Sequence, residues 1–301
     1  MPIQAVNSVV LGVEDLAAAR RFYTDFGLSE ATTAADRSDF RTLDGTEINL
    51  RRADDPALPP AVIDGPTVRE IVWGVDDAAT LDRIADELAK DRDAAFDADG
   101  VLHSRDDDGY GIAFRVDRRD AYVPPAPRLN LYGAPPARPV NQRVDFAEPI
   151  RPASVAHVVL FSTDVIAATR FYTERLGFRV SDMFREGRGA FLRAEGSGYH
   201  HNLFLIRGER RGLHHIAFAV NDFNDVVLGG KTMLARDWTP KMGPGRHLIG
   251  SNYFWYFESP CGGAMELTAD MDRADDDWEV REWDFVPSNT AAWSTSFNPT
   301  R

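Results

Sequence analysis

The sequence lacks several features that mark secreted, membrane-spanning or nucleic-acid-binding proteins. It has one cysteine, Cys261, so no internal disulfide can form and a reducing cytoplasm fits. No apolar run approaches the length of a membrane span, and the N-terminus lacks the basic and apolar regions of a signal peptide. Positive charge is also scarce, with 34 Lys and Arg against 47 Asp and Glu, a formal charge of −13. Because nucleic acids and anionic membranes do not attract a polyanion, we expect a soluble cytoplasmic protein that binds neither.

Histidine is nearly absent from the first half of the chain. That half holds only His103, whereas the other six of the seven histidines lie between positions 157 and 247. The six are His157, His200, His201, His214, His215 and His247. Glu266 follows them, and two imidazoles with one carboxylate are the ligand set of a non-haem Fe(II) oxygenase. The skew predicts that the chemistry is confined to the second half.

An internal repeat relates the two halves of this 301-residue chain, a length that favours two domains. Residues 9–25 and 158–174 share Val-Val-Leu, Asp, Ala-Ala and Arg-Phe-Tyr-Thr in step. Each copy predicts a strand, then a helix capped by Asp15 or Asp164 that ends near a glycine. A strand followed by a helix recurs at 71–90 and from 215 onward. The pattern predicts an α+β fold with four strand–helix–strand modules, two in each half.

A proline-rich stretch separates the halves. Residues 119–153 have the composition of a linker, which places one domain at 1–118 and a second at 154–301. The second domain includes a C-terminal tail from about residue 270, whose structure the pattern does not specify. We expect the tail tryptophans to be packing residues, with a tail folded over the site as the alternative.

Strand alternation indicates which histidines can meet. Around residue 157, His157 shares a face with Val159 and Phe161, and His215 shares one with the small residues Ala217 and Ala219. His214 would then lie on the opposite face with the bulky Ile216 and Phe218. Because a face of small residues leaves room for a pocket, His215 is the preferred ligand and His214 is expected in the core or behind the ligands.

A hairpin supplies the third ligand. If 252–258 and 263–268 pair around a turn at Cys261, facing positions sum to about 522 and Tyr256 lies opposite Glu266. The loop 243–250 precedes this hairpin, so His247 could reach the same cavity. The repeat aligns Ser8, Glu70 and Ala113 with His157, His215 and Glu266, so the first half is predicted to be metal-free.

These residues resemble the vicinal oxygen chelate superfamily (glyoxalase, bleomycin resistance, dioxygenase), and within it the two-domain type I extradiol catechol dioxygenases. The matching motifs are the strand around His157, Arg170-Phe-Tyr-Thr, Leu213-His-His-Ile-Ala-Phe218, Gly245-Arg-His247, Tyr256 and Gly262-Gly-Ala-Met-Glu266. One departure is the turn Ser-Pro-Cys-Gly-Gly at 259–263, which touches no ligand. The resemblance implies four βαβββ modules in two tandem domains, each a curved mixed sheet or half-barrel flanked by helices.

The resemblance also implies the roles of the site residues. It assigns Fe(II), with Mn(II) as an option, to His157, His215 and Glu266. It assigns acid–base catalysis to His201, with His200 as the register alternative and otherwise an exposed neighbour. His247 and Tyr256 match residues that contact substrate hydroxyls.

The implied reaction is meta-cleavage of a catechol-type aromatic by O2, in aromatic catabolism and by a homo-oligomer. The alternatives are a glyoxalase-like metal-dependent lyase or isomerase that needs no O2, and a non-enzymatic small-molecule-binding protein of the same fold.

Overall fold

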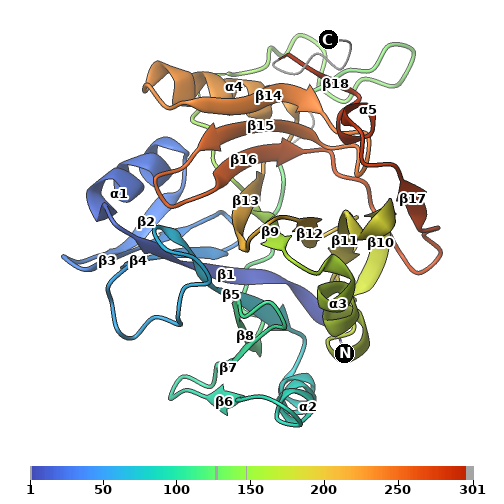
Figure 1. Ribbon diagram of the computed structural model, residues 1–301. Coiled ribbons are helices and arrows are strands. Elements are labelled where there is room, and N and C mark those ends of the chain that lie inside the picture. Colours follow the sequence, from blue (N-terminus) through green and yellow to red (C-terminus); the bar gives the residue numbers. More distant parts are fainter. Residues whose placement is uncertain (1, 126–127, 147, 296–301) are drawn as a thin grey trace.

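Two large mixed sheets, one from each half of the chain, lie side by side in the computed structural model (Figure 1). The structure describes residues 2–125, 128–146 and 148–295. The sheet of the first half has the strand order β2-β3-β4-β1-β5-β8-β7-β6. Its elements are β1 (Ile3–Val13), α1 (Leu16–Asp25), β2 (Ser29–Thr33), β3 (Arg37–Arg41), β4 (Glu47–Arg52), β5 (Thr67–Val75), α2 (Ala78–Leu88), β6 (Ala95–Phe96), β7 (Leu102–Arg105) and β8 (Gly111–Val116).

The second half repeats this order and adds a strand at each edge of its sheet. The order is β17-β10-β11-β12-β9-β13-β16-β15-β14-β18. Its elements are β9 (Ser154–Ser162), α3 (Val165–Arg170), a π-helical turn (Phe171–Arg175), β10 (Arg179–Phe184), a short 3-10 turn (Arg185–Gly187), β11 (Gly189–Arg193), β12 (Leu203–Arg207), β13 (Gly212–Ala219), α4 (Phe223–Ala235), β14 (Pro240–Arg246), β15 (Tyr253–Glu258), β16 (Ala264–Ala269), β17 (Arg281–Trp283), α5 (Pro287–Thr290) and β18 (Trp293–Ser294). The four predicted βαβββ modules are confirmed.

An aspartate begins each of the four principal helices. The side chains of Asp15, Asp77, Asp164 and Asp222 accept a hydrogen bond from a backbone N–H three residues further on. Such a cap satisfies one of the four free N–H groups of a helix start and stabilises the helix by about 1 kcal/mol. The helix start was therefore readable in all four modules from a short polar residue after a β-branched run.

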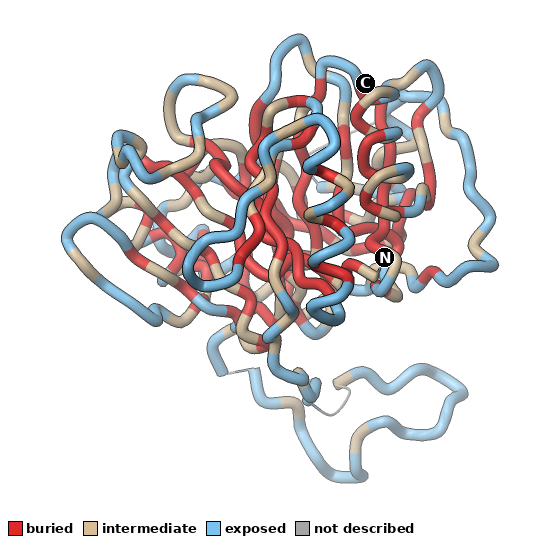
Figure 2. The backbone as a smooth tube through the Cα atoms, turned by 90° about the horizontal axis from the view of Figure 1, so that it is seen from below, coloured by how far each residue is buried: buried red, intermediate tan, exposed pale blue. Residues whose placement is uncertain are grey.

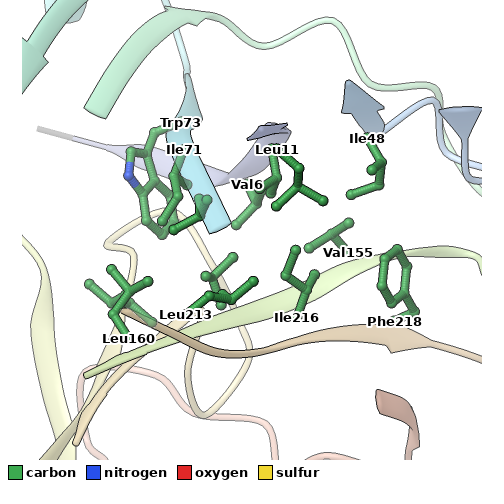
Figure 3. Close-up of a cluster of buried hydrophobic side chains, with 14 of the residues drawn as sticks. Val6, Leu11, Ile48, Ile71, Trp73, Val155, Leu160, Leu213, Ile216 and Phe218 are labelled. Atoms are coloured by element: carbon green, nitrogen blue, oxygen red, sulfur yellow. The ribbon is translucent and has the colours of Figure 1, made fainter. Parts of the chain in front are cut away.

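The two sheets bury their apolar faces against each other. Val6, Leu11 and Trp73 of the first half face Leu160 and Ile216 of the second, and all are fully buried (Figure 3). Buried chain is therefore concentrated in the middle of the molecule and exposed chain around its edge (Figure 2). Because these two faces cover each other, the opposite face of the second sheet can line a cavity, as Val159 of β9 does.

Tyr110 of the first half ties together the two strands that carry the histidines of the second. Its hydroxyl accepts a hydrogen bond from Gly212 N (2.5 Å) and donates to Phe161 O (2.6 Å). Phe161 lies in β9 and Gly212 at the start of β13, so one side chain joins both strands near the site. The first half thus supports the second without contributing to its chemistry.

The chain between β8 and β9 has no helix or strand among its described residues, and it contains the proline-rich 119–153. Arg128 anchors it through an ion pair with Asp222 (2.8 Å). The division into domains at these positions stays a prediction. No helix in the described part of the chain is long and apolar enough to cross a membrane.

Candidate functional site

Three buried side chains from adjacent strands converge at the centre of the second sheet. His157 comes from β9, His215 from β13 and Glu266 from β16. His215 Nε2 lies 3.2 Å from His157 Nε2, and Glu266 Oε2 lies 3.1 Å from His215 Nε2 and 3.3 Å from His157 Nε2. The antiparallel pairing of β9 with β13 and the parallel pairing of β13 with β16 place these three positions side by side.

The spacing of the three donor atoms fits a metal ion. Two donors bonded to one ion at about 2.1 Å, at right angles or slightly more, lie about 3.0–3.3 Å apart. Glu266 Oε2 is fully buried, and the two imidazole nitrogens at 3.1 and 3.3 Å make no hydrogen bond of acceptable geometry with it. A buried carboxylate oxygen without a hydrogen bond is costly unless a cation compensates it. Among the described residues, these three form the one cluster with metal-ligand spacing.

Burial disfavours the charged form of two imidazoles at the site. It lowers the pKa of His215 to about 4 against the opposing effect of Glu266, and it lowers the pKa of His201 well below the usual value. Burial alone would raise the pKa of the Glu266 carboxyl, but the adjacent His157 and His215 outweigh burial and hold that pKa below its usual range. Imidazoles bind a metal in their neutral form, so as ligands these two imidazoles and one carboxylate would carry a net charge of −1, which a divalent cation would reverse in sign.

His214 departs from the prediction. A β-bulge between Leu213 and His215 interrupts the alternation of β13, so Leu213 takes the place in the core expected for His214. His214 instead lines the cavity beside His215, and their Nδ1 atoms lie 2.6 Å apart. The prediction that His215 faces the cavity agrees with the geometry. The prediction that His214 shares a face with Ile216 and Phe218 was wrong.

Tyr256 and His247 form a hydrogen-bonded pair on one side of the cluster. Tyr256 pairs with Glu266 in the β15–β16 hairpin, as the sum of 522 predicts, and its ring centroid lies 5.0 Å from that of His215. His247 Nε2 lies 2.9 Å from Tyr256 Oη, and His247 Nδ1 lies 2.7 Å from Thr290 O. A carbonyl only accepts, so Nδ1 carries the hydrogen and Nε2 accepts the tyrosine O–H. The oxygen of Tyr256 keeps its lone pairs for the cavity.

His201 lies on another side of the cluster, and its neighbour His200 is not exposed. The ring centroid of His201 lies 4.2 Å from that of His157, and His201 lines the cavity. His200 is 0% exposed, which overturns its interpretation as an exposed neighbour. The C-terminal tail covers it, because the Trp278 ring packs 5.2 Å from the His200 ring.

Residues beyond the predicted set complete the site. Asn252 is buried and donates hydrogen bonds to Glu266 Oε1 (3.2 Å) and Thr268 Oγ1 (2.8 Å), which orients the carboxylate. Its spacing of four from Tyr256 along the strand was a usable signal. Phe285 and Thr290 bring the tail over the cavity, so the alternative of a tail folded over the site holds.

The cluster lies at the polar end of a cavity of about 420 Å³. Most of the remaining wall is apolar. Its apolar members are Val159, Phe184, Phe191, Phe204, Ile206, Met242, Ile249 and Phe285. Among the described residues, Lys241 is the one lining side chain with a permanent charge.

The matching positions of the first half hold no such cluster. Ser8 lies opposite Val72 and Glu70 opposite Gly111, the same registers that relate His157 to Ala217 and His215 to Ala264. The predicted alignment of Ser8 with His157 and of Glu70 with His215 is therefore correct. Glu70 pairs instead with His103 (2.8 Å), and this raises the pKa of His103 to about 9.

The chain is similar in sequence to several known proteins. A family model described as Glyoxalase/Bleomycin resistance protein/Dioxygenase superfamily matches residues 154–267, which include all three converging residues. Metapyrocatechase 2 of Cupriavidus necator is 31% identical over 284 residues, 90% of this chain and 83% of that protein. An iron-dependent extradiol dioxygenase of Rhodococcus jostii is 31% identical over 141 residues, 42% of this chain and 47% of that protein.

The fold is similar to that of a solved structure over nearly the whole chain. The Mn(II)-bound glyoxalase from Novosphingobium aromaticivorans superimposes with a TM-score of 0.80 and covers 99% of this chain and 93% of its own. The sequence identity is 23%, so this likeness concerns the fold.

Proposed function

The chain belongs to the extradiol dioxygenases of the glyoxalase/bleomycin resistance protein/dioxygenase superfamily, and we propose that it uses Fe(II) to insert both atoms of O2 into a catechol-type ring. The carbon–carbon bond cleaved would join one hydroxyl-bearing carbon to its ring neighbour that bears no hydroxyl. The observation that carries this proposal is the convergence of His157, His215 and Glu266 beside a cavity that is also lined by the proton-handling groups His201, Tyr256 and His247.

We assign the metal to these three residues. Fe(II) held there would supply open coordination positions for substrate and O2 and a path for electrons from the catechol to O2. The iron-dependent relative supports Fe(II), and the Mn(II)-bound structural neighbour leaves Mn(II) as an option. Asn252 would keep the carboxylate of Glu266 turned toward the metal through its hydrogen bond to Oε1.

Tyr256 and His247 would remove a proton from the catechol. Tyr256 Oη donates its hydrogen to His247 Nε2, so the same oxygen can accept the hydrogen of a substrate hydroxyl while passing its own to the imidazole. The carbonyl of Thr290 holds His247 in the tautomer that makes this possible. Burial, followed by the charge of Glu266, raises the pKa of Tyr256 well above its usual value, so the phenol stays protonated between turnovers.

His201 would act from a different side. Its ring packs against His157, whereas the Tyr256 ring packs against His215, and His201 lines the cavity where O2 and the opening ring would lie. Its nitrogen on that side could exchange a proton with the reacting oxygens. Two proton-handling groups on separate sides suit a reaction that removes a proton from one oxygen of the substrate and delivers one elsewhere.

Anaerobic reconstitution tests this function directly. The purified protein is loaded with Fe(II) and then with catechol under argon, and air is admitted while absorbance and O2 are followed. We expect a yellow conjugated product and one O2 consumed for each ring cleaved. Catechol that binds without O2 uptake would contradict the proposal and favour the lyase or isomerase alternative.

The apolar cavity predicts a preference for uncharged ring substituents. Each buried methylene contributes about 0.8 kcal/mol, whereas a carboxylate buried without a partner is strongly disfavoured. We expect kcat/KM for 4-methylcatechol to exceed that for 3,4-dihydroxybenzoate by about 10-fold or more. Initial rates on the iron-loaded enzyme measure this ratio. A preference for the carboxylate that Lys241→Met removes would contradict the prediction.

A further inference from the structure

Asp182, His200 and His201 form a buried hydrogen-bonded chain that ends at the cavity. Asp182 Oδ2 lies 3.0 Å from His200 Nε2, and His200 Nδ1 lies 2.9 Å from His201 Nδ1. The three residues are 2%, 0% and 4% exposed. The Nδ1 atom of His201 therefore bonds to His200, and its Nε2 atom is the one left to face the cavity.

The hydrogen bonds from Asp182 to His201 have a defined direction. A carboxylate oxygen accepts, so His200 must carry its hydrogen on Nε2. His200 Nδ1 is then a lone pair, and His201 must donate its Nδ1–H to it. His201 Nε2 is left as a lone pair toward the substrate. With the opposite tautomers, two lone pairs would face each other between Asp182 and His200.

The C-terminal tail holds this chain in place. Arg281 N–H donates to Asp182 Oδ1 (2.8 Å) where β17 pairs with β10, and His200 N–H donates to Asp272 O (2.9 Å). Figure 1 shows β17 at the outer edge of the second sheet. The Trp278 ring covers His200, and a Cβ at Gly250 would lie 3.4 Å from His200 Nδ1. Both oxygens of Asp182 thus receive a hydrogen, and the chain is closed to solvent.

We propose that Asp182 and His200 are positioning residues, which hold the ring of His201 in place and keep its Nε2 free of hydrogen toward the cavity. This inference rests on the proposed function for its catalytic consequence, but the tautomer itself is a property of the protein alone. The arrangement corresponds to the general pattern in which a buried carboxylate selects the tautomer of a working imidazole through a hydrogen bond.

A purely structural role for the pair makes a different prediction. The first half contains a comparable pair, Glu70 with His103, whose two atoms lie 2.8 Å apart and which ends at no reactive group. If the Asp182–His200 pair only fills the interior, removing either pair should change stability and leave turnover alone. If it positions His201, only the Asp182–His200 pair should affect turnover.

Asp182→Asn tests the direction of the chain with almost no change in shape. If the amide oxygen keeps the hydrogen bond from Arg281, its NH2 group faces His200 Nε2. His200 must then carry its hydrogen on Nδ1, and His201 must carry its own on Nε2. In Fe(II)-loaded enzyme we expect kcat to fall about 10- to 100-fold, with the anaerobic dissociation constant for catechol changed less than about 3-fold.

The tautomer is read independently of activity. In protein labelled with 15N-histidine, in the metal-free and Zn(II)-loaded forms, NMR shows which nitrogen of each of the seven rings bears hydrogen. We expect His201 to carry it on Nδ1 in the wild type and on Nε2 in Asp182→Asn. A wild-type hydrogen on Nε2, or no change in the variant, would overturn the proposal.

Three further variants complete the test. His200→Phe removes the link while filling its space, and its kcat should fall by the same amount, about 10- to 100-fold. It provides the test if Asp182→Asn fails to fold. Asp182→Asn placed on a His201→Phe background should cause no further loss, since Asp182 acts through His201; an additive loss would contradict this. Glu70→Gln is the matched control and should leave kcat unchanged. Without dioxygenase activity in the wild type the proposed function fails, while the NMR result still decides the tautomer.

Discussion

His215→Ala is expected to abolish metal binding and, with it, activity. The substitution removes one of three donor atoms that lie 3.1–3.3 Å apart, and it leaves the carboxylate of Glu266 with one imidazole. Because loss of a residue that only supports a ligand typically weakens metal binding about 10- to 100-fold, loss of a ligand should cost more than about 1000-fold. Competition with a coloured chelator measures the Fe(II) affinity.

His214→Ala is the matched comparison. The residue is adjacent in sequence and lines the same cavity, but its Nδ1 faces His215 Nδ1 and not the donor cluster. We expect its Fe(II) affinity to fall by about 10-fold, because the tautomer of His215 loses its support. His103→Ala, in the first half, should change nothing. Equal losses for His214→Ala and His215→Ala would mean that the bulge does not direct His215 inward.

Tyr256→Phe is expected to lower kcat about 100- to 10,000-fold while Fe(II) and catechol still bind. The substitution keeps the ring that packs beside His215 and removes only the oxygen that bonds to His247 Nε2. Initial rates and anaerobic catechol titration separate turnover from binding. Tyr253→Phe removes a hydroxyl from the same strand, outside the cavity lining, and should leave kcat unchanged.

His247 should behave as part of the same unit. If Tyr256 passes its hydrogen to His247, His247→Phe lowers kcat as well, and the double variant is about as slow as the slower single one. Multiplied losses in the double variant would show that the two side chains act separately. Wild-type turnover in Tyr256→Phe would remove the phenol from the mechanism altogether.

Local sequence patterns predicted much of the site. The alternation of β9 predicted that His157 and Val159 share one face, and the register of the β15–β16 hairpin predicted that Tyr256 lies opposite Glu266. The structure agrees with both. These predictions succeed because the two-residue period of a strand and the register of a tight hairpin depend on neighbours in sequence. The vacant positions of the first half followed from the repeat for the same reason, because both copies have the same registers.

The two wrong predictions, for His214 and His200, share a different cause. His214 leaves the alternation of β13 at a bulge between β13 and β9, an irregularity in how two distant strands pair that neither strand shows alone. His200 appeared exposed because its neighbours in sequence are polar, but Trp278 and Asp272, more than 70 residues further on, cover it. Burial depends on contacts between distant residues, which a local pattern does not contain.

The sequence by itself therefore determined the duplicated modules, the aspartate caps at Asp15 and Asp164 and the concentration of six of the seven histidines in one half. The modules and their caps depend on local hydrogen bonding and on strand periodicity. The set of three converging residues followed from strand alternation together with the family resemblance. The tertiary structure alone decided which side of β13 His214 occupies, that the tail closes the cavity, and that Asp182 and His200 lie behind His201. Those outcomes depend on how separate strands pair and on where a segment without regular pattern comes to rest.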